Sequence, residues 1–130
     1  MKVFIADDSK AVVERLADLL EEEVPGAQLV GQAGDVPEAV RGVQKLKPDV
    51  LILDLQMPGG TGLDVLLAIR ADNPGLRVLI CTNHPYPQRR EECFSAGADF
   101  FLDKSADFEK IPAILRELIH SETKTSPNTR

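Results

Sequence analysis

The sequence predicts an α/β domain: a parallel sheet doubly wound with helices on both faces. Five short apolar runs alternate with five longer segments of helical periodicity, joined by connections of a few residues. The runs are continuously apolar, as strands buried on both faces require, rather than apolar at every second position. At 130 residues the chain has room for one such domain.

The five predicted strands are short apolar runs. The second run is the shortest, and the residues on either side of it, Gln28 and Gly31, do not carry apolar side chains. This predicts a strand at an edge of the sheet. In chain order the runs are residues 3–6, 29–30, 50–53, 78–81 and 100–102.

The first two predicted helices carry start and stop signals. Ser9 is expected to cap the first helix, which ends before Pro25. Asp35 and Glu38 have the spacing of a capping box at the start of the second helix, which ends before Pro48.

The next two helices are delimited in the same way. Thr61 is expected to cap a helix that stops at Asn73, and residues 87–96 form a polar helix that ends at Gly97. The apolar face of the earlier helix is predicted from Leu63, Leu66, Leu67 and Ile69.

The last helix is predicted over residues 107–120, with Pro112 in its first turn because proline is not tolerated further inside. We expect the domain to occupy residues 1–120. Residues 121–130 contain nothing apolar, which predicts a frayed, disordered polar tail.

Composition narrows the classes of function. Fifteen Lys and Arg residues against 21 Asp and Glu residues give a net charge of −6, and Arg89-Arg90 is the only compact basic pair, which speaks against direct nucleic-acid binding. No apolar run approaches the length of a membrane span, and no signal peptide is recognised. Two cysteines, Cys81 and Cys93, are too few for a disulfide framework. We therefore expect a cytoplasmic protein.

Polar residues follow four of the five predicted strands, at the edge where ligands bind in parallel sheets. Asp7 and Asp8 follow the first strand, Asp54 the third, Thr82 the fourth and Lys104 the fifth. Three carboxylates at one edge repel one another unless a cation lies among them. A hard divalent ion with oxygen ligands, most naturally Mg²⁺, meets that need.

An aspartate beside such an ion can attack phosphorus and become an acyl phosphate. Asp8 (through the metal), Lys104 and Thr82 are expected to stabilise the phosphoryl oxygens, which leaves Asp54 as the nucleophile. Each residue alone has a simpler interpretation: a helix cap for the Asp7-Asp8 pair, a solvated charge for Lys104 and a turn residue for Thr82. The glycine-rich phosphate cradles of dinucleotide-binding and P-loop proteins are absent from the sequence.

Together these motifs resemble the receiver domains of response regulators in two-component signalling, the CheY-like superfamily. The resemblance covers about residues 2 to 120. It implies a flavodoxin-like fold with strand order 2-1-3-4-5 and five helices. Its motifs are the acidic pair within residues 4–9, the acceptor loop at 54–62, Thr82, and the block at 96–104.

The resemblance also implies roles for residues of the predicted metal site. Asp54 is the expected phosphoacceptor and a metal ligand. Asp8 is the expected direct Mg²⁺ ligand, Asp7 a neighbour that binds through water, and Gln56 a ligand through its backbone carbonyl.

Thr82 and Phe101 occupy the places of the family's switch pair, a hydroxyl and an aromatic ring that move on phosphorylation. The expected donor is a sensor histidine kinase or a phosphotransfer protein. The expected output is a protein target bound through the face of helix four, strand five and helix five. Gln56 and His84 flank the approach of attacking water. The domain is expected to catalyse only its own phosphotransfer and dephosphorylation, so it is not an enzyme in the usual sense.

The sequence departs from the family pattern at Ser105, where proline is common, at Asn83, where a small residue is common, and in the stiff segment 85–87. A single-domain response regulator is the favoured interpretation. The alternatives are a receiver domain of a longer regulator, an Mg²⁺-dependent phosphohydrolase with an aspartyl nucleophile, and a phosphorylation-independent binding module. Crowding by Asn83 is the sequence feature that points to the last of these.

Overall fold

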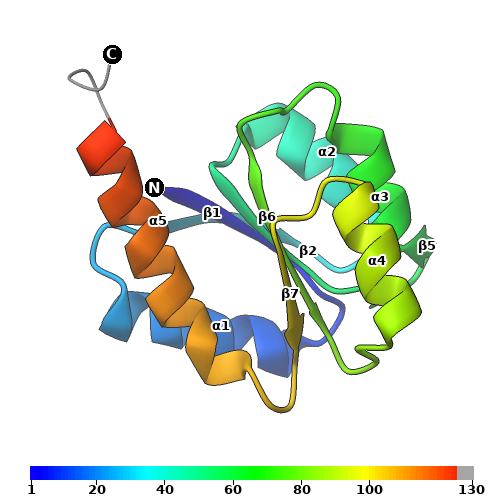
Figure 1. Cartoon of the computed structure of the whole chain (residues 1–130), viewed down its shortest axis with the longest axis horizontal. Helices are drawn as coiled ribbons and strands as arrows, with labels where there is room; N and C mark the ends of the chain where they lie inside the picture. Colours follow the sequence, from blue (N-terminus) through cyan, green and yellow to red (C-terminus); the bar gives the residue numbers. More distant parts are fainter. Residues whose placement is uncertain (126–130) are drawn as a thin grey trace.

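A parallel sheet forms the centre of the computed structural model, which describes residues 1–125 (Figure 1). Within these residues the sheet has five strands in the order β2-β1-β3-β6-β7. This order confirms the predicted 2-1-3-4-5 arrangement and the edge position of the second strand. The strands are β1 (Lys2–Ala6), β2 (Gln28–Ala33), β3 (Val50–Leu53), β6 (Arg77–Thr82) and β7 (Phe100–Asp103).

Five α-helices in the same part of the chain cover the two faces of the sheet. Figure 1 shows α1 and α5 on one face and α2, α3 and α4 on the other. Successive β1 residues serve opposite faces: Val3 and Ile5 belong to the core under α1 and α5, Phe4 and Ala6 to the core under the other three. The helices are α1 (Lys10–Glu23), α2 (Val36–Leu46), α3 (Gly62–Ile69), α4 (Pro87–Ser95) and α5 (Ile111–Thr125).

The predicted cap residues are in place at the helix starts, but the expected capping box of α2 is only half formed, because Glu38 accepts from Gly34 N rather than from Asp35 N. Ser9 Oγ accepts a hydrogen bond from Val12 N at 3.2 Å, and the carboxylate of Asp35 accepts one from Glu38 N at 2.8 Å. Thr61 forms a full capping box with Asp64. Each cap satisfies a backbone N–H that has no partner inside its helix.

Two features of α3 differ from the prediction. The helix ends at Ile69 rather than at Asn73, because Asn73 Nδ2 donates to the carbonyl of Ile69 at 2.7 Å and terminates the helix there. Leu67, which the periodicity placed on the apolar face, is 63% exposed, whereas its neighbours Val65 and Leu66 are buried.

The last helix begins in two stages and extends further than expected. A short 3-10 helix, η1 (Phe108–Lys110), precedes α5, and Pro112 lies in the first turn of α5 as predicted. The helix continues to Thr125, beyond the expected boundary at residue 120. Residues 126–130 of the predicted tail lie outside the described residues. No helix in the described part of the chain is long and apolar enough to span a bilayer.

The loop after β3 folds into a small hairpin that the sequence did not predict. Strands β4 (Gln56–Met57) and β5 (Gly60–Thr61) pair in antiparallel fashion. Gly62 N then donates to Leu55 O at 2.9 Å, and a Cβ at Gly62 would collide with the carbonyl of Asp54. The glycine allows the chain to pass close to the end of β3, where Asp54 lies.

Arg70 joins the loops that precede β6 and β7, at the end of the sheet opposite to Asp54. Its Nη1 donates to the carbonyls of Asn73 at 2.9 Å and Leu76 at 2.7 Å. Its Nη2 donates to the carbonyl of Gly97 at 2.5 Å and to Asp99 Oδ2 at 3.3 Å. One guanidinium group thus fixes the loop after α3 against the loop between α4 and β7.

Candidate functional site

Three carboxylates meet at the carboxyl edge of the sheet. One oxygen each from Asp7, Asp8 and Asp54 lies within 4.8 Å of the others. The parallel register explains the convergence, because Ala6 of β1 pairs with Leu53 of β3 and the acidic residues follow these positions. Asp7 and Asp54 are buried, each 6% exposed, whereas Asp8 is exposed.

Lys104 enters this cluster from the end of β7. Its Nζ lies 2.8 Å from Asp7 Oδ2 and 3.3 Å from Asp54 Oδ2. The Lys104 side chain is 10% exposed, so the ammonium group is largely withdrawn from water. The three groups form a buried arrangement of two carboxylates around one ammonium.

Burial and charge shift the proton affinities of this arrangement. Burial raises the pKa of Asp54 above its ordinary value and Asp7 adds to the rise, while the N–H of Gln56 and the charge of Lys104 act against it. Burial alone would lower the pKa of Lys104, but the hydrogen bond to Asp7 and the charge of Asp54 outweigh it, so the pKa rises. The site therefore keeps its ammonium charged and has an excess of negative charge.

The predicted carboxylates, Gln56 and Lys104 border one hollow of about 270 Å³, which we call the acceptor-site hollow. Gln56 of the acceptor loop (residues 54–62) borders it on one side, and His84 of the loop after β6 borders it on another. Asn83 also lines it and is exposed, so it does not fill the buried part of the site. The hollow is lined by Asp7, Asp8, Ser9, Val12, Asp54, Gln56, Asn83, His84 and Lys104.

The oxygen-rich composition of this hollow fits a hard divalent cation. Mg²⁺ prefers carboxylate and carbonyl oxygens and retains several waters. The exposed carboxylate of Asp8 offers a ligand that costs little desolvation, and Asp54 lies beside it with one oxygen held by Gln56 N at 3.2 Å. The donor set therefore suits Mg²⁺ better than a soft metal, which requires sulfur or nitrogen ligands.

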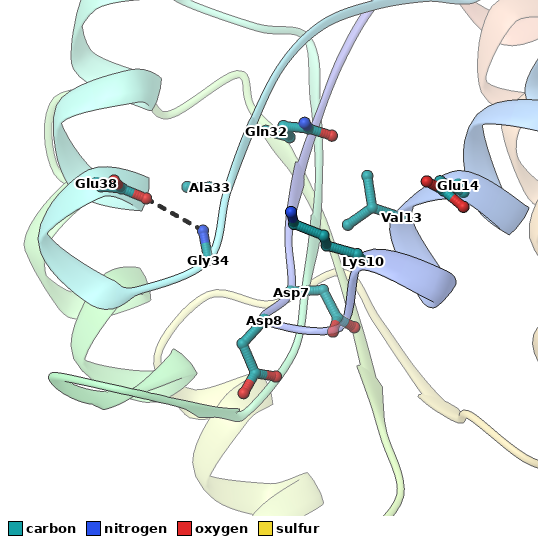
Figure 2. Close-up of a pocket in the computed structure, with 9 residues that line it drawn as sticks. All are labelled: Asp7, Asp8, Lys10, Val13, Glu14, Gln32, Ala33, Gly34 and Glu38. Atoms are coloured by element: carbon teal, nitrogen blue, oxygen red, sulfur yellow. Dashed lines mark hydrogen bonds between the residues drawn. The ribbon is translucent and has the colours of Figure 1, made fainter.

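A second hollow, of about 470 Å³, lies on the other side of the acidic pair, between α1 and the loop after β2 (Figure 2). Figure 2 shows the Lys10 side chain extending along this hollow toward Gln32, and Glu38 accepting a hydrogen bond from Gly34 N at 3.3 Å. Asp7 and Asp8 border both hollows, so the acidic pair lies between them.

Thr82 and Phe101, the two predicted switch residues, are not among the residues that line the acceptor-site hollow. Thr82 is fully buried, and its Oγ1 accepts a hydrogen bond from His84 N at 3.0 Å. Phe101 is 8% exposed and contacts Phe94 of α4, with ring centroids 6.5 Å apart. The structure thus holds the threonine hydroxyl in a local turn and the aromatic ring inside the core.

The loop that carries Lys104 is fixed by Ser105, which the sequence marked only as a departure from the family pattern, and by Asp103 and Asp107, to which no role was assigned. Asp103 Oδ1 accepts hydrogen bonds from Ser105 N at 2.9 Å and Ser105 Oγ at 3.1 Å. Asp107 Oδ2 accepts one from Asp103 N at 2.9 Å, and Lys104 N donates to Thr82 O at 2.8 Å. Serine at position 105 therefore has a structural role, and the Asp-x-Ser pattern was the available signal for this turn.

The fold and the site together define a class: a doubly wound α/β domain with an acidic cluster and a lysine at its carboxyl edge. Residues 3–116 match the family described as the response regulator receiver domain, and the chain belongs to this family. The predicted resemblance is confirmed by this match.

Curated relatives include longer regulators. The chain is 36% identical to the DNA-binding transcriptional activator DevR/DosR of Mycobacterium tuberculosis over 104 residues, which cover 80% of this chain and 48% of that protein. It is 35% identical to the nitrate/nitrite response regulator protein NarP of Escherichia coli over 125 residues, which cover 96% and 56% respectively. The chain spans about half the length of the curated relatives it matches.

Solved structures show the same fold. The response regulator domain of Thermotoga maritima CheB is 28% identical, with a TM-score of 0.79 and 98% coverage of both chains. A chain of the CheX-CheY-BeF3-Mg+2 complex from Borrelia burgdorferi is 26% identical, with a TM-score of 0.83 and coverage of 92% of this chain and 89% of that one.

Proposed function

We propose that the chain is a phosphorylation-controlled switch in which Asp54 accepts a phosphoryl group. One observation carries this proposal: the buried carboxylate of Asp54 lies 3.3 Å from the ammonium group of Lys104 and within a cluster of three carboxylates. This arrangement supports the proposal because a carboxylate that could act as nucleophile, a cation that could neutralise charge and oxygens that could bind a metal lie close together.

The transfer balances without any further reactant. A carboxylate oxygen of Asp54 attacks phosphorus, and the bond between phosphorus and the leaving group breaks. With an acyl phosphate donor the electron pair leaves on the carboxylate product. With phosphohistidine protonated on its other ring nitrogen, the pair leaves on the attached nitrogen and neutral imidazole is released. Lys104 stays charged throughout and offsets the charge of the phosphoryl oxygens.

Mg²⁺ fits the same residues. Asp8, Asp54 and the backbone carbonyl of Gln56 would hold it, and Asp7 would contact it through water. The ion, when bound, supplies positive charge that offsets the carboxylates and the phosphoryl oxygens. Asp7 is already paired with Lys104, which favours its indirect role and leaves the exposed Asp8 as the more accessible ligand.

The switch is proposed to act through Thr82 and Phe101. Rotation of the Thr82 side chain toward a phosphoryl oxygen would break its hydrogen bond from His84 N. Phe101 would then repack against α4, where it already contacts Phe94. The output face is the one formed by α4, β7 and α5, whose apolar hollow of about 280 Å³ includes Phe100 and Leu118.

The proposed partners are a histidine kinase or a phosphotransfer protein as donor and a protein target as acceptor of the signal. Among the two expected settings, the relatives favour a receiver within a longer regulator over a single-domain regulator, because this chain spans about half of each. A transcriptional output is therefore proposed for the whole protein. Direct nucleic-acid contact by this acidic domain is not expected.

Intact-protein mass spectrometry after incubation with acetyl phosphate tests the proposal. We expect one added phosphoryl group in the presence of Mg²⁺, and none when Mg²⁺ is removed or Asp54 is replaced in Asp54→Asn. An unchanged yield in Asp54→Asn would contradict the assignment of the nucleophile. No adduct under any condition, together with no beryllofluoride binding, would favour the phosphorylation-independent module.

A further inference from the structure

Arg89 lines a hollow that adjoins the acceptor site. This hollow, of about 430 Å³, lies between the first turn of α4 and the acceptor loop, and we call it the Arg89 hollow. Asp8 and Gln56 line both the Arg89 hollow and the acceptor-site hollow. The two hollows therefore adjoin at Asp8 and Gln56, with Asp54 on the side of the acceptor-site hollow.

The guanidinium group of Arg89 is uncommitted. Among the described residues Arg89 has no side-chain hydrogen bond and no ion pair, although it is partly buried. Its neighbour Arg90 is exposed and lies over the ring of Phe94, 5.0 Å from the centroid. The two adjacent arginines therefore differ: Arg90 packs on the surface of α4 and Arg89 faces the acceptor loop.

Helix stability does not explain Arg89. It lies in the first turn of α4, where the helix dipole disfavours a positive charge, and this turn contains no acidic residue. The helix begins at Pro87, whose fixed φ suits the first helical position, and its cap residue Tyr86 makes no side-chain hydrogen bond. A cation kept at an unfavourable place beside the site indicates an anionic ligand.

The charges of the site specify the chemistry of that ligand. Lys104 is shared between Asp7 and Asp54 before any donor arrives. A phosphoryl group brings further negative charge to a cluster that already holds three carboxylates. Arg89 is the cation of the adjoining hollow, and a guanidinium group suits the oxygens of a phosphoryl group because its donors form a planar fork.

We propose that Arg89 binds the phosphoryl group of the donor in the Arg89 hollow and directs it to Asp54. This inference rests on the proposed function and adds to it a donor-binding residue. The bond changes remain those at Asp54, and Arg89 neither gains nor loses a proton. The shared ligand chemistry is a phosphoryl group, carried either by a small acyl phosphate or by a nitrogen, as in phosphohistidine.

Arg89→Ala and Arg90→Ala test this inference, because each removes one positive charge from neighbouring positions of α4. Initial rates of phosphorylation are measured by intact mass against donor concentration for Arg89→Ala, Arg90→Ala and Arg89→Lys, with acetyl phosphate and with phosphoramidate. We expect Arg89→Ala to lower the second-order rate constant about tenfold with both donors. Arg90→Ala is expected to stay within about twofold of the parent, since long-range effects of a surface charge are screened by salt. Arg89→Lys should recover part of the rate.

A metal titration without donor provides a second readout. Because Arg89 lies in the same hollow as Asp8, its removal should leave Mg²⁺ affinity unchanged or raise it. Equal rates in Arg89→Ala and Arg90→Ala would overturn the inference, and so would weakened Mg²⁺ binding in Arg89→Ala. A loss confined to acetyl phosphate would overturn it too, because the contact would then be with the leaving acetate. If the parent takes no phosphoryl group from either donor, the proposed function itself fails and this inference fails with it.

Discussion

The Nζ of Lys104 lies 2.8 Å from Asp7 Oδ2. Lys104 follows β7 and Asp7 follows β1, so this contact spans the two strands, β3 and β6, that separate them in the sheet. The same ammonium group lies 3.3 Å from Asp54. The lysine thus lies closer to Asp7 than to Asp54, the proposed nucleophile. Under the proposed function, a phosphoryl group on Asp54 would share Lys104 with Asp7.

Removal of this ammonium group is predicted to destabilise the metal-free domain. In Lys104→Ala, Asp7 and Asp54 keep their backbone hydrogen bonds from Ser9 N and Gln56 N but are left buried without a cation, so the free energy of unfolding should fall by about 3 kcal/mol without Mg²⁺. Mg²⁺ should restore part of the loss, because it supplies positive charge to the same carboxylates. Phosphorylation should slow while Mg²⁺ still binds. Denaturant unfolding with and without Mg²⁺, and metal titration, measure these effects.

Lys110→Ala is the control for that variant. Lys110 forms an ion pair with Asp107 at 2.9 Å, but its side chain is 68% exposed. Exposed pairs contribute little, so a loss below about 0.5 kcal/mol is expected. Similar losses in both lysine variants would show that the Lys104 pair is no stronger than a surface pair.

Replacing the acceptor carboxylate is predicted to stabilise the metal-free domain. Burial raises the pKa of Asp54, so its charged form is disfavoured by folding. The folded state then binds more protons than the unfolded state between the ordinary pKa of 3.8 and the raised value. The stability of the parent relative to Asp54→Asn should therefore fall as the pH rises from 3.8 through the raised pKa, and stay level above it. Melting curves of both proteins across this range provide the measurement. A difference in stability between the parent and Asp54→Asn that does not change with pH would contradict the prediction that burial disfavours the charged form of Asp54.

A methyl group at position 97 is predicted to disturb the Arg70 network. Gly97 has a φ of +109°, and a Cβ there would lie 2.7 Å from Arg70 Nε. Gly97→Ala should lower the free energy of unfolding by about 1–3 kcal/mol, because it adds both backbone strain and a collision. Gly75→Ala is the matched control, since a Cβ at Gly75 meets nothing within 4 Å. Equal stabilities of the two variants, measured by denaturant unfolding, would contradict both the backbone strain at position 97 and the cost of displacing Arg70.

The lifetime of the phosphorylated state is predicted to depend on Gln56 and His84. Both line the acceptor-site hollow, where water must approach phosphorus. Gln56→Ala and His84→Ala should change the dephosphorylation rate severalfold with little change in melting temperature. Gln44→Ala and His120→Ala remove the same residue types from exposed positions and should leave the rate unchanged. Loss of intact phosphoprotein mass over time gives the rates, and identical rates in all four variants would exclude the proposed role.

The fold was predictable because its signals are local and repeated. Buried strands are continuously apolar, and caps such as Ser9 and Thr61 lie directly before their helices. The hairpin of β4 and β5 was not predictable, since two-residue strands leave no periodicity to detect. The exposure of Leu67 was missed for a related reason: periodicity alone does not show where the apolar face of a short helix ends.

The gathering of the site residues was predictable from topology, because parallel strands bring their carboxyl ends to one edge. Their individual contacts were not. Whether Lys104 pairs with Asp7 or with Asp54 depends on side-chain placement across the sheet. The role of Arg89 depends on how closely α4 approaches the acceptor loop, which no pattern in the sequence expresses.

Mapping the modified residue shows whether Asp54 is the phosphoacceptor. The protein is phosphorylated with acetyl phosphate and Mg²⁺, the acyl phosphate is trapped by borohydride reduction, and the digested peptides are sequenced by mass spectrometry. We predict that reduction occurs at Asp54 and at no other carboxylate, Asp7 and Asp8 included. Modification at Asp8, at another side chain, or at no residue of a protein that does bind Mg²⁺ would contradict it.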